Sequence, residues 1–207
     1  MRKVVLAMMT TLNGRVDDPE AWMSGVGNDL YADIDRAYDT YDTVLVGQTT
    51  YQEMYEYWPG AETEDAPIGG LSDAAPATDE AAEVNKRMAR KMNAYKKYVF
   101  SSGREKRTLE WTNCEPVVVR LDAELEQFVA DLKAQPGKDI HLAGGARLAQ
   151  TFVRLGLVDE YRFYVHPVAS PGKTVFDQLE GRRGLELVSA TPYADGAIGL
   201  YYKPRIS

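Results

Sequence analysis

The sequence predicts a single α/β domain on a mixed, mostly parallel β-sheet, and two observations carry this prediction. Short apolar runs alternate with amphipathic helical stretches along most of the 207 residues, which is typical of parallel strand–helix–strand units. Near the end, two strand-like stretches flank the turn dipeptide Asp195–Gly196, and this arrangement predicts an antiparallel hairpin. The length suits one domain, 1–207.

The predicted strands are apolar runs of four to eight residues bounded by turn or polar residues. Residues 3–9 and 42–47 are continuously apolar or nearly so, as in strands buried on both faces. In chain order, we expect strands at 3–9, 42–47, 97–100, 116–121, 138–142, 160–167, 185–192 and 197–203.

The predicted helices show apolar residues at helical spacing. Asn28 is expected to cap the first and Asp122 a later one, and Gly156 stands where a helix would stop. Residues 59–80, rich in Pro, Gly, Ala, Asp and Glu, predict a long surface loop or insertion. The expected helices cover 28–38, 49–57, 79–92, 122–132 and 146–155.

Composition narrows the functional classes. The net charge of −7 argues against nucleic-acid binding. No apolar run approaches the roughly 20 residues that a membrane-spanning helix needs, and the N-terminus lacks a signal-peptide pattern, so a cytoplasmic location is expected. Cys114 is the single cysteine. His141 lies within a strand and His166 precedes Pro167; neither has metal-ligand spacing, so we expect structural roles and no metal.

The cationic residues are unevenly distributed. No Lys or Arg occurs between Arg36 and Lys86, whereas nine occur from Lys86 to Arg107, opposed only by Glu105. One interpretation is a solvated helix face, and the other is a positive field near an anionic ligand. Nucleic-acid binding through this stretch is a third hypothesis, which the acidic total disfavours.

Three predicted strands end in glycine or hydroxyl residues. Glycines before a helix expose backbone N–H groups, and the helix dipole favours an anion there. A tight turn is the alternative interpretation of Gly144–Gly145. Because ligands of open α/β sheets bind at the carboxyl ends of strands, the three ends together favour a nucleotide site. They are Gly47–Gln48–Thr49–Thr50, Ser101–Ser102–Gly103–Arg104 and Gly144–Gly145–Ala146–Arg147.

An ordered set of short motifs resembles the dihydrofolate reductase-like superfamily. The chain is most similar to stand-alone relatives of the C-terminal reductase domain in riboflavin-biosynthesis deaminase/reductases. The resemblance covers nearly the whole chain and implies a three-layer α/β/α fold. The motifs are Thr11–Gly14, Asp42–Tyr51, Lys97–Ser101, Gly144–Ala146, Gly156–Glu160, Pro167, Gly172 and Phe176.

The resemblance implies NADPH as cofactor and hydride transfer to a small heterocyclic substrate. The two glycines, joined by a cis peptide in this resemblance, and Ala146 would then cradle the pyrophosphate, with Thr49 and Thr50 also donating. Ser101, Ser102 and Arg104 would lie near the 2′-phosphate. Gly47, Gln48 and Arg147 belong to the same expected site.

The substrate is expected on the loop and helix that follow the first strand. Thr10, Asn13, Asp17 and Trp22 are the candidate contacts, and Asp29 or Asp33 would orient a ring or supply a proton. Solvation of the helix surface is the alternative for the two aspartates. Relatives commonly pair, so a homodimer is also expected.

Three residues depart from the family's pattern. Gln48 replaces an arginine, which weakens the case for NADPH over NADH. Asn13 and Ala143 replace carboxylates linked to substrate handling, so the riboflavin-pathway substrate is in doubt. These losses motivate a second hypothesis, a non-catalytic nucleotide-binding or regulatory protein on the same fold.

Overall fold

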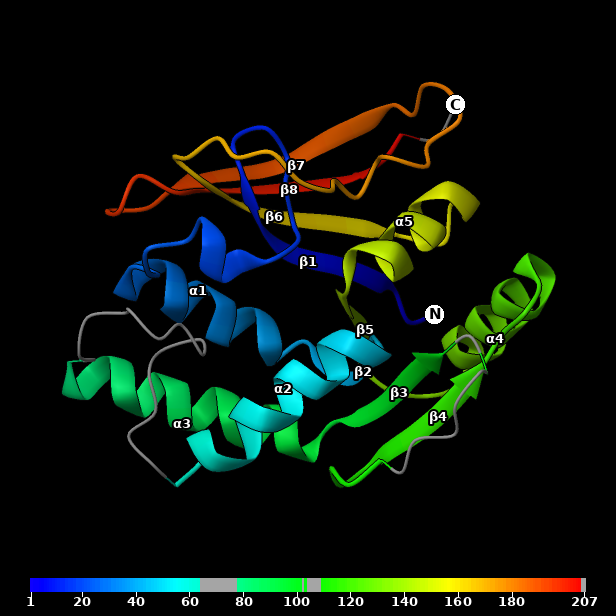
Figure 1. The fold of residues 1–207 in the computed structure, drawn as a ribbon, viewed down its shortest axis with the longest axis horizontal. Coiled ribbons are helices and arrows are strands. Elements are labelled where there is room, and N and C mark those ends of the chain that lie inside the picture. Colours follow the sequence, from blue (N-terminus) through cyan, green and yellow to red (C-terminus); the bar gives the residue numbers. More distant parts are fainter. Residues whose placement is uncertain (64–77, 102, 104–108, 206–207) are drawn as a thin grey trace.

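The structure, a computed structural model, describes residues 1–63, 78–101, 103 and 109–205. Its centre is one eight-stranded sheet of order β4-β3-β2-β5-β1-β6-β8-β7 (Figure 1). The first six strands in this order are parallel, and β8 runs antiparallel to both β6 and β7. The predicted mixed sheet and C-terminal hairpin are therefore confirmed. The strands are β1 (Val4–Thr11), β2 (Tyr41–Gly47), β3 (Lys96–Ser101), β4 (Cys114–Val118), β5 (Asp139–Gly144), β6 (Glu160–His166), β7 (Leu185–Pro192) and β8 (Ile198–Pro204).

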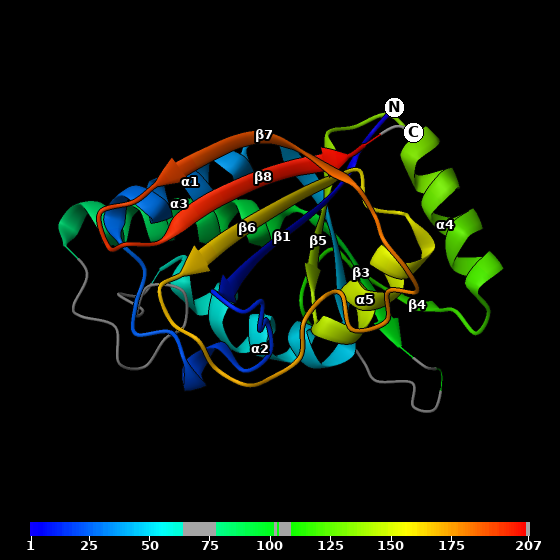
Figure 2. The same ribbon diagram turned by 90° about the horizontal axis from the view of Figure 1, so that it is seen from above.

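Helices cover both faces of the sheet, which gives three layers (Figures 1 and 2). One apolar cluster joins the sheet to α1, α2 and α3, and a second joins it to α4 and α5. Neighbouring strand residues divide between the clusters, as the two-residue period of a strand requires: Val44 belongs to the first and Leu45 to the second. The helices are α1 (Asn28–Tyr38), α2 (Gln48–Ala61), α3 (Asp79–Ala94), α4 (Asp122–Ala134) and α5 (Ala146–Leu155), with a short 3-10 turn at Pro19–Ala21.

The boundaries of the predicted 59–80 loop were wrong at both ends. Helix α2 continues through Pro59 to Ala61, and α3 already begins at Asp79. Trp58 and Ala61 are buried in the core, so tertiary packing outweighs the local tendency of Pro59 to end a helix. The remainder of that prediction, residues 64–77, lies outside the described residues.

Both predicted caps were shifted by one residue. Asn28 and Asp122 are the first residues of their helices, and Gly27 and Leu121 occupy the cap positions. At α4 the carboxylate of Glu124 accepts hydrogen bonds from the backbone N–H groups of Arg120 and Leu121. A carboxylate inside the first turn therefore does the capping that we expected of Asp122. The fourth strand also ends early, at Val118 rather than Leu121.

Among the described residues, none of the helices has the length and apolar character needed to cross a bilayer.

His141 is a buried polar residue in the middle of β5. Its ring stacks on Tyr41 with centroids 5.1 Å apart, and its Nε2 lies 3.4 Å from the carbonyl oxygen of Ala7. Its Nδ1 has no hydrogen-bond partner among the described residues. Burial lowers the pKa of His141 to about 4, so the ring is neutral at physiological pH.

The burial of neutral His141 predicts that the folded protein loses stability as the pH falls. Below about pH 6.5 the unfolded chain takes up a proton at His141 that the folded chain refuses until about pH 4, so the free energy of unfolding falls across this interval. The shift corresponds to about 3 kcal/mol. In urea unfolding from pH 7 to pH 4, His141→Leu should lose about that much less stability than the wild type. Equal acid sensitivity of the two proteins would contradict the prediction.

Candidate functional site

A cleft of about 1320 Å³ opens at the carboxyl ends of β2 and β5, beside β1. Gly47 ends β2 and Gly144 ends β5, and both strands pass at once into helices, α2 and α5. The two strands are hydrogen-bonded neighbours. The cleft therefore lies where open α/β sheets bind their ligands.

Two helix N-termini face this cleft side by side. Gly47 and Gly145 are the N-cap residues of α2 and α5, and neither helix has a side-chain cap. Their first-turn N–H groups and the positive ends of their dipoles are thus available to an anion. A Cβ atom added to Gly47 would lie 3.5 Å from the backbone nitrogen of Gly145, so the two turns are close neighbours.

The backbone at Gly144 and Gly145 has a conformation and a close contact that residues with a Cβ atom would not readily accept. The peptide bond between the two glycines is cis, as the resemblance suggested. Gly144 has φ +108°, a conformation that residues with a Cβ rarely adopt. A Cβ on Gly145 would come within 2.8 Å of Thr50 Oγ1. These glycines are therefore needed to hold α5 against the first turn of α2.

The structure brings most of the predicted cofactor residues together. Gly144 stands directly before the lining residue Gly145 without lining the cleft itself. Ser102 and Arg104 lie outside the described residues. The predicted cofactor residues that line the cleft are Gly47, Gln48, Thr49, Thr50, Ser101, Gly145, Ala146 and Arg147.

Arg120 is a cationic lining residue that the sequence analysis missed. It follows β4 and lines the cleft with Ser101, and a Cβ on Gly103 would lie 3.9 Å from its Nε. The arginine therefore lies beside the segment that leaves β3. The sequence did contain a signal for Arg120, because the predicted strand 116–121 is a fourth strand that ends at the same edge of the sheet.

The candidate substrate residues separate into two groups. Asp17 lines the cleft, whereas Trp22 lines an adjoining pocket and donates from Nε1 to the backbone oxygen of Asp17 at 2.9 Å. Thr10 is buried and donates to the carbonyl of Thr11. Asn13 bonds the backbone of Ser170. Thr10 and Asn13 thus shape the loop without lining the cleft.

Asp17 is held as a carboxylate. Burial alone would raise its pKa, but hydrogen bonds from the backbone N–H of Lys173 and from Arg15 Nε lower the pKa below the usual value. The two donors lie 2.8 and 3.2 Å from Oδ1. At neutral pH Asp17 therefore presents a negative charge and accepts hydrogen bonds at the mouth of the cleft.

Asp29 and Asp33 do not line the cleft, contrary to the expectation of a catalytic carboxylate on this helix. Asp29 accepts a hydrogen bond from the backbone N–H of Ala194 at 2.9 Å. Asp33 accepts from the hydroxyls of Tyr193 and Tyr201 at 2.7 and 2.5 Å. One turn apart on α1, they share a face that fastens the C-terminal hairpin.

The cleft-facing side of α1 is instead aromatic and apolar. Tyr31, Ile34 and Tyr38 occupy it, and Trp58 of α2 and Met88 of α3 complete this wall. His141 lines the floor, and its ring is tilted against Tyr38 with centroids 5.6 Å apart. Tyr31, Ile34 and Tyr38 recur at helical spacing, which is also the spacing of residues that pack in a core. The sequence alone therefore does not show whether this face of the helix meets a cleft or a sheet.

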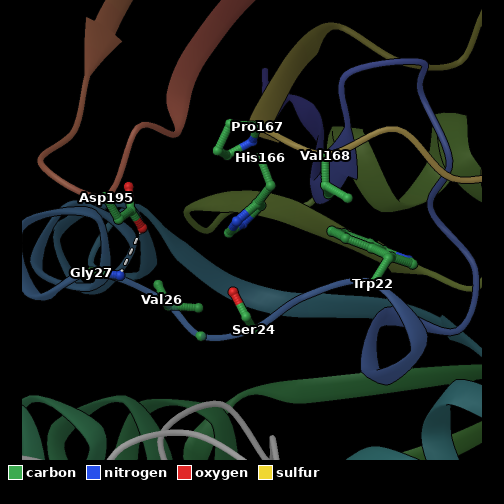
Figure 3. Close-up of a pocket in the computed structure, with 9 residues that line it drawn as sticks. Trp22, Ser24, Val26, Gly27, His166, Pro167, Val168 and Asp195 are labelled. Atoms are coloured by element: carbon green, nitrogen blue, oxygen red, sulfur yellow. Dashed lines mark hydrogen bonds between the residues drawn. The ribbon is translucent and has the colours of Figure 1, made fainter.

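A smaller pocket of about 320 Å³ adjoins the cleft, and Val26 lines both. Figure 3 shows the His166 ring between Asp195 and Trp22 at the centre of this pocket. The Asp195 carboxylate accepts from the backbone N–H of Gly27 at 2.9 Å, which ties the loop before α1 to the hairpin turn. The carboxylates, cysteine and histidines of the described residues form no group able to hold a metal ion.

Comparisons with known proteins agree on the fold. A curated relative, the uncharacterized protein YyaP of Bacillus subtilis, is 29% identical and the match covers 97% of this chain and 94% of YyaP. A putative riboflavin biosynthesis protein from Shewanella has a TM-score of 0.66 at 14% identity, with 99% of each chain covered.

A dihydrofolate reductase from Enterococcus faecalis, whose structure was solved in complex with NADP(H), has a TM-score of 0.58 at 13% identity, covering 99% of this chain and 97% of that one. The dihydrofolate reductase-like fold expected from the sequence is thus confirmed. The family model of the RibD C-terminal domain matches residues 2–198, so the chain belongs to the RibD C-terminal domain family.

Proposed function

We propose that the protein is an NADPH-dependent reductase of a small heterocyclic substrate. The observation that carries the proposal is the pair of uncapped helix N-termini, α2 and α5, held together at Gly47 and Gly145 at the edge of the cleft. A pyrophosphate fits this cradle because it brings two negative charges to two positive helix ends. The family and the fold neighbour solved with NADP(H) support the same cofactor.

The remaining cofactor contacts follow from the lining residues. Thr49, Thr50 and the N–H groups of α2 would hold the pyrophosphate together with Gly145, Ala146 and Arg147 of α5. Ser101 and Arg120 would hold the 2′-phosphate at the far edge of the sheet. Arg120 supplies the fixed charge that Gln48 does not.

NADPH, when bound, supplies a hydride to an electrophilic C=N or C=O carbon of the substrate. The aromatic wall of Tyr31, Tyr38 and Trp58 would orient a flat ring and exclude water. Asp17, ionised at neutral pH, would accept a hydrogen bond from a ring N–H rather than donate a proton. The proton of the reduction would then come from water.

A second candidate is a nucleotide-binding protein without turnover. It is favoured by the lack of a carboxylate at Asn13 and Ala143 and by the engagement of Asp29 and Asp33 with the hairpin. The two candidates differ in one measurement, oxidation of bound NADPH by pteridine, pyrimidine or quinone compounds. Oxidation by any of them selects the reductase.

The first prediction concerns the cradle. NADPH at millimolar concentration should raise the melting temperature, because a ligand that binds the native state stabilises it. Gly145→Ala should weaken NADPH at least tenfold, since its Cβ would press on Thr50 Oγ1 at 2.8 Å. Gly184→Ala is the matched control, with its Cβ 3.6 Å from the Arg205 side chain, and should bind as the wild type. If NADPH gives no saturable shift, the proposed function is wrong.

The second prediction concerns the 2′-phosphate. Arg120→Ala should weaken NADPH about tenfold, or about 1.4 kcal/mol, and leave NADH unchanged, because NADH lacks that phosphate. Arg147→Ala, at the start of α5, should weaken both cofactors. Calorimetric titration of the two variants with the two cofactors checks this, and an equal loss of NADPH and NADH in Arg120→Ala would place the 2′-phosphate elsewhere.

The third prediction concerns assembly. We propose a homodimer through β7, an edge strand of the sheet that carries Leu187 and Val188 at 53% and 61% exposure. Sedimentation equilibrium should give twice the mass of 23.1 kDa, and Val188→Lys should give the monomer. A monomeric wild type would rule out this interface.

A further inference from the structure

Among the described residues, both arginines that line the cleft lie in one half of it. Arg147 is on α5, and Arg120 directly precedes α4. Lys173 lies between the two halves, because the carbonyl of the next residue, Thr174, accepts a hydrogen bond from Gln150 of α5 at 2.7 Å, while the backbone N–H of Lys173 donates to Asp17 Oδ1 at 2.8 Å. The two arginines are accounted for by the phosphates of the proposed cofactor.

The opposite half, walled by α1, α2 and α3, has no Lys or Arg among its described lining residues. The sequence itself contains no Lys or Arg between Arg36 and Lys86, so α2 and the residues after it up to 85 carry no cationic side chain. Arg36 itself is largely exposed and pairs with Asp33, on the face of α1 that does not line the cleft. A phosphate entering this half would meet no compensating charge from α2 or from the residues that follow it up to 85.

The walls of this half make an uncompensated anion costly. Tyr31 and Met88 are 3% and 2% exposed, and Trp58 and Ile34 are also buried. His141 on the floor is neutral at physiological pH because burial lowers its pKa to about 4. Moving an ionised group from water into such surroundings without a partner is strongly unfavourable.

The mouth of this half carries negative charge. Glu53, Asp17 and Asp18 line it. The pKa of Glu53 is raised by burial and by the neighbouring carboxylates Glu20, Glu56 and Asp18, which shows that these groups repel one another. Arg15 pairs with Asp17 and Asp18, and Lys173 lies beside Asp17, so part of this charge is offset. With Glu53 and its neighbours Glu20 and Glu56 the carboxylates still outnumber these two cations, and the field at the mouth favours neutral or cationic ligands over anions.

The side pocket continues the same pattern. It is lined by the Asp195 carboxylate, the Ser24 hydroxyl and the His166 ring, and its lining within the described part of the chain contains no Lys or Arg (Figure 3). Burial lowers the pKa of His166, so its ring is also neutral at pH 7. A substituent that reached this pocket would find hydrogen-bonding groups suited to a hydroxyl or an amine.

We propose that the substrate is a flat, neutral or cationic heterocycle without a phosphate group. Its ring lies against Tyr31, Tyr38 and Trp58, and a hydroxyl or amine substituent points to Asp195 and His166. This inference rests on the proposed function, because it assigns the cationic half of the cleft to the cofactor. It separates the protein from any reductase of a phosphoribosylamino-pyrimidine.

The test uses matched ligands that differ by one phosphate, namely riboflavin and its 5′-phosphate, and uridine and its 5′-phosphate. They are titrated by calorimetry into protein saturated with NADPH, so that the cofactor's phosphate site is filled. At least one unphosphorylated compound should bind, about tenfold tighter than its phosphate. Equal or tighter binding of either phosphate, or no binding of both unphosphorylated compounds at millimolar concentration, overturns the inference.

Reversing the charge of Glu53 tests whether negative charge at the mouth is what disfavours phosphorylated ligands. Glu53→Lys should strengthen binding of a phosphorylated compound about fivefold relative to its partner, because it places a cation at the mouth. Glu126→Lys, an equal change of net charge on an exposed site of α4 that does not line the cleft, should leave the ratio unchanged. An equal change in both variants, or none in Glu53→Lys, counts against the inference. NADPH binding by the wild type is measured separately. If NADPH does not bind, the proposed function is wrong; if NADPH binds but the phosphorylated ligands are preferred, only the inferred substrate class is wrong.

Discussion

The close approach of Gly47 and Gly145 is the constraint on which the rest of the site depends. Parallel pairing of β2 with β5 brings two strand ends to one edge of the sheet, and each end turns into a helix without a side-chain cap. The start of α5 packs against the first turn of α2 because Gly145 has no Cβ, which would lie 2.8 Å from Thr50 Oγ1. In the proposed function, their joint positive potential selects the end of the cleft that binds phosphate.

That potential gives the cleft a polarity. Arg120 and Arg147 reinforce it on the side of α4 and α5, while carboxylates and aromatic rings occupy the side of α1 and α2. The C-terminal hairpin influences the side of α1 and α2 without lining the cleft there. Asp29 and Asp33 bind it to α1, which leaves the opposite face of that helix to form the aromatic wall.

Much of the fold and of the proposed cofactor half was predictable, because both follow from local patterns. Apolar runs predicted every strand, and the motif Gly144–Gly145 predicted a helix start facing a ligand. The half of the cleft proposed for the substrate was harder to predict. Tyr31 and Tyr38 have the spacing of core residues, and Asp29 and Asp33 have the spacing of a paired site. Which face of α1 meets the cleft depends on contacts with Tyr193 and Ala194, more than 150 residues away.

By itself the sequence determined the order of strands and helices, the three glycine- or hydroxyl-bearing strand ends, and the absence of cations between Arg36 and Lys86. These are properties of short segments or of composition, and packing does not change them. Only the tertiary structure decided that α2 continues past Pro59, that Arg120 joins the cleft, and that His141 lies buried in its floor. Each of these depends on burial between segments distant in the chain, and no local pattern encodes how such segments meet.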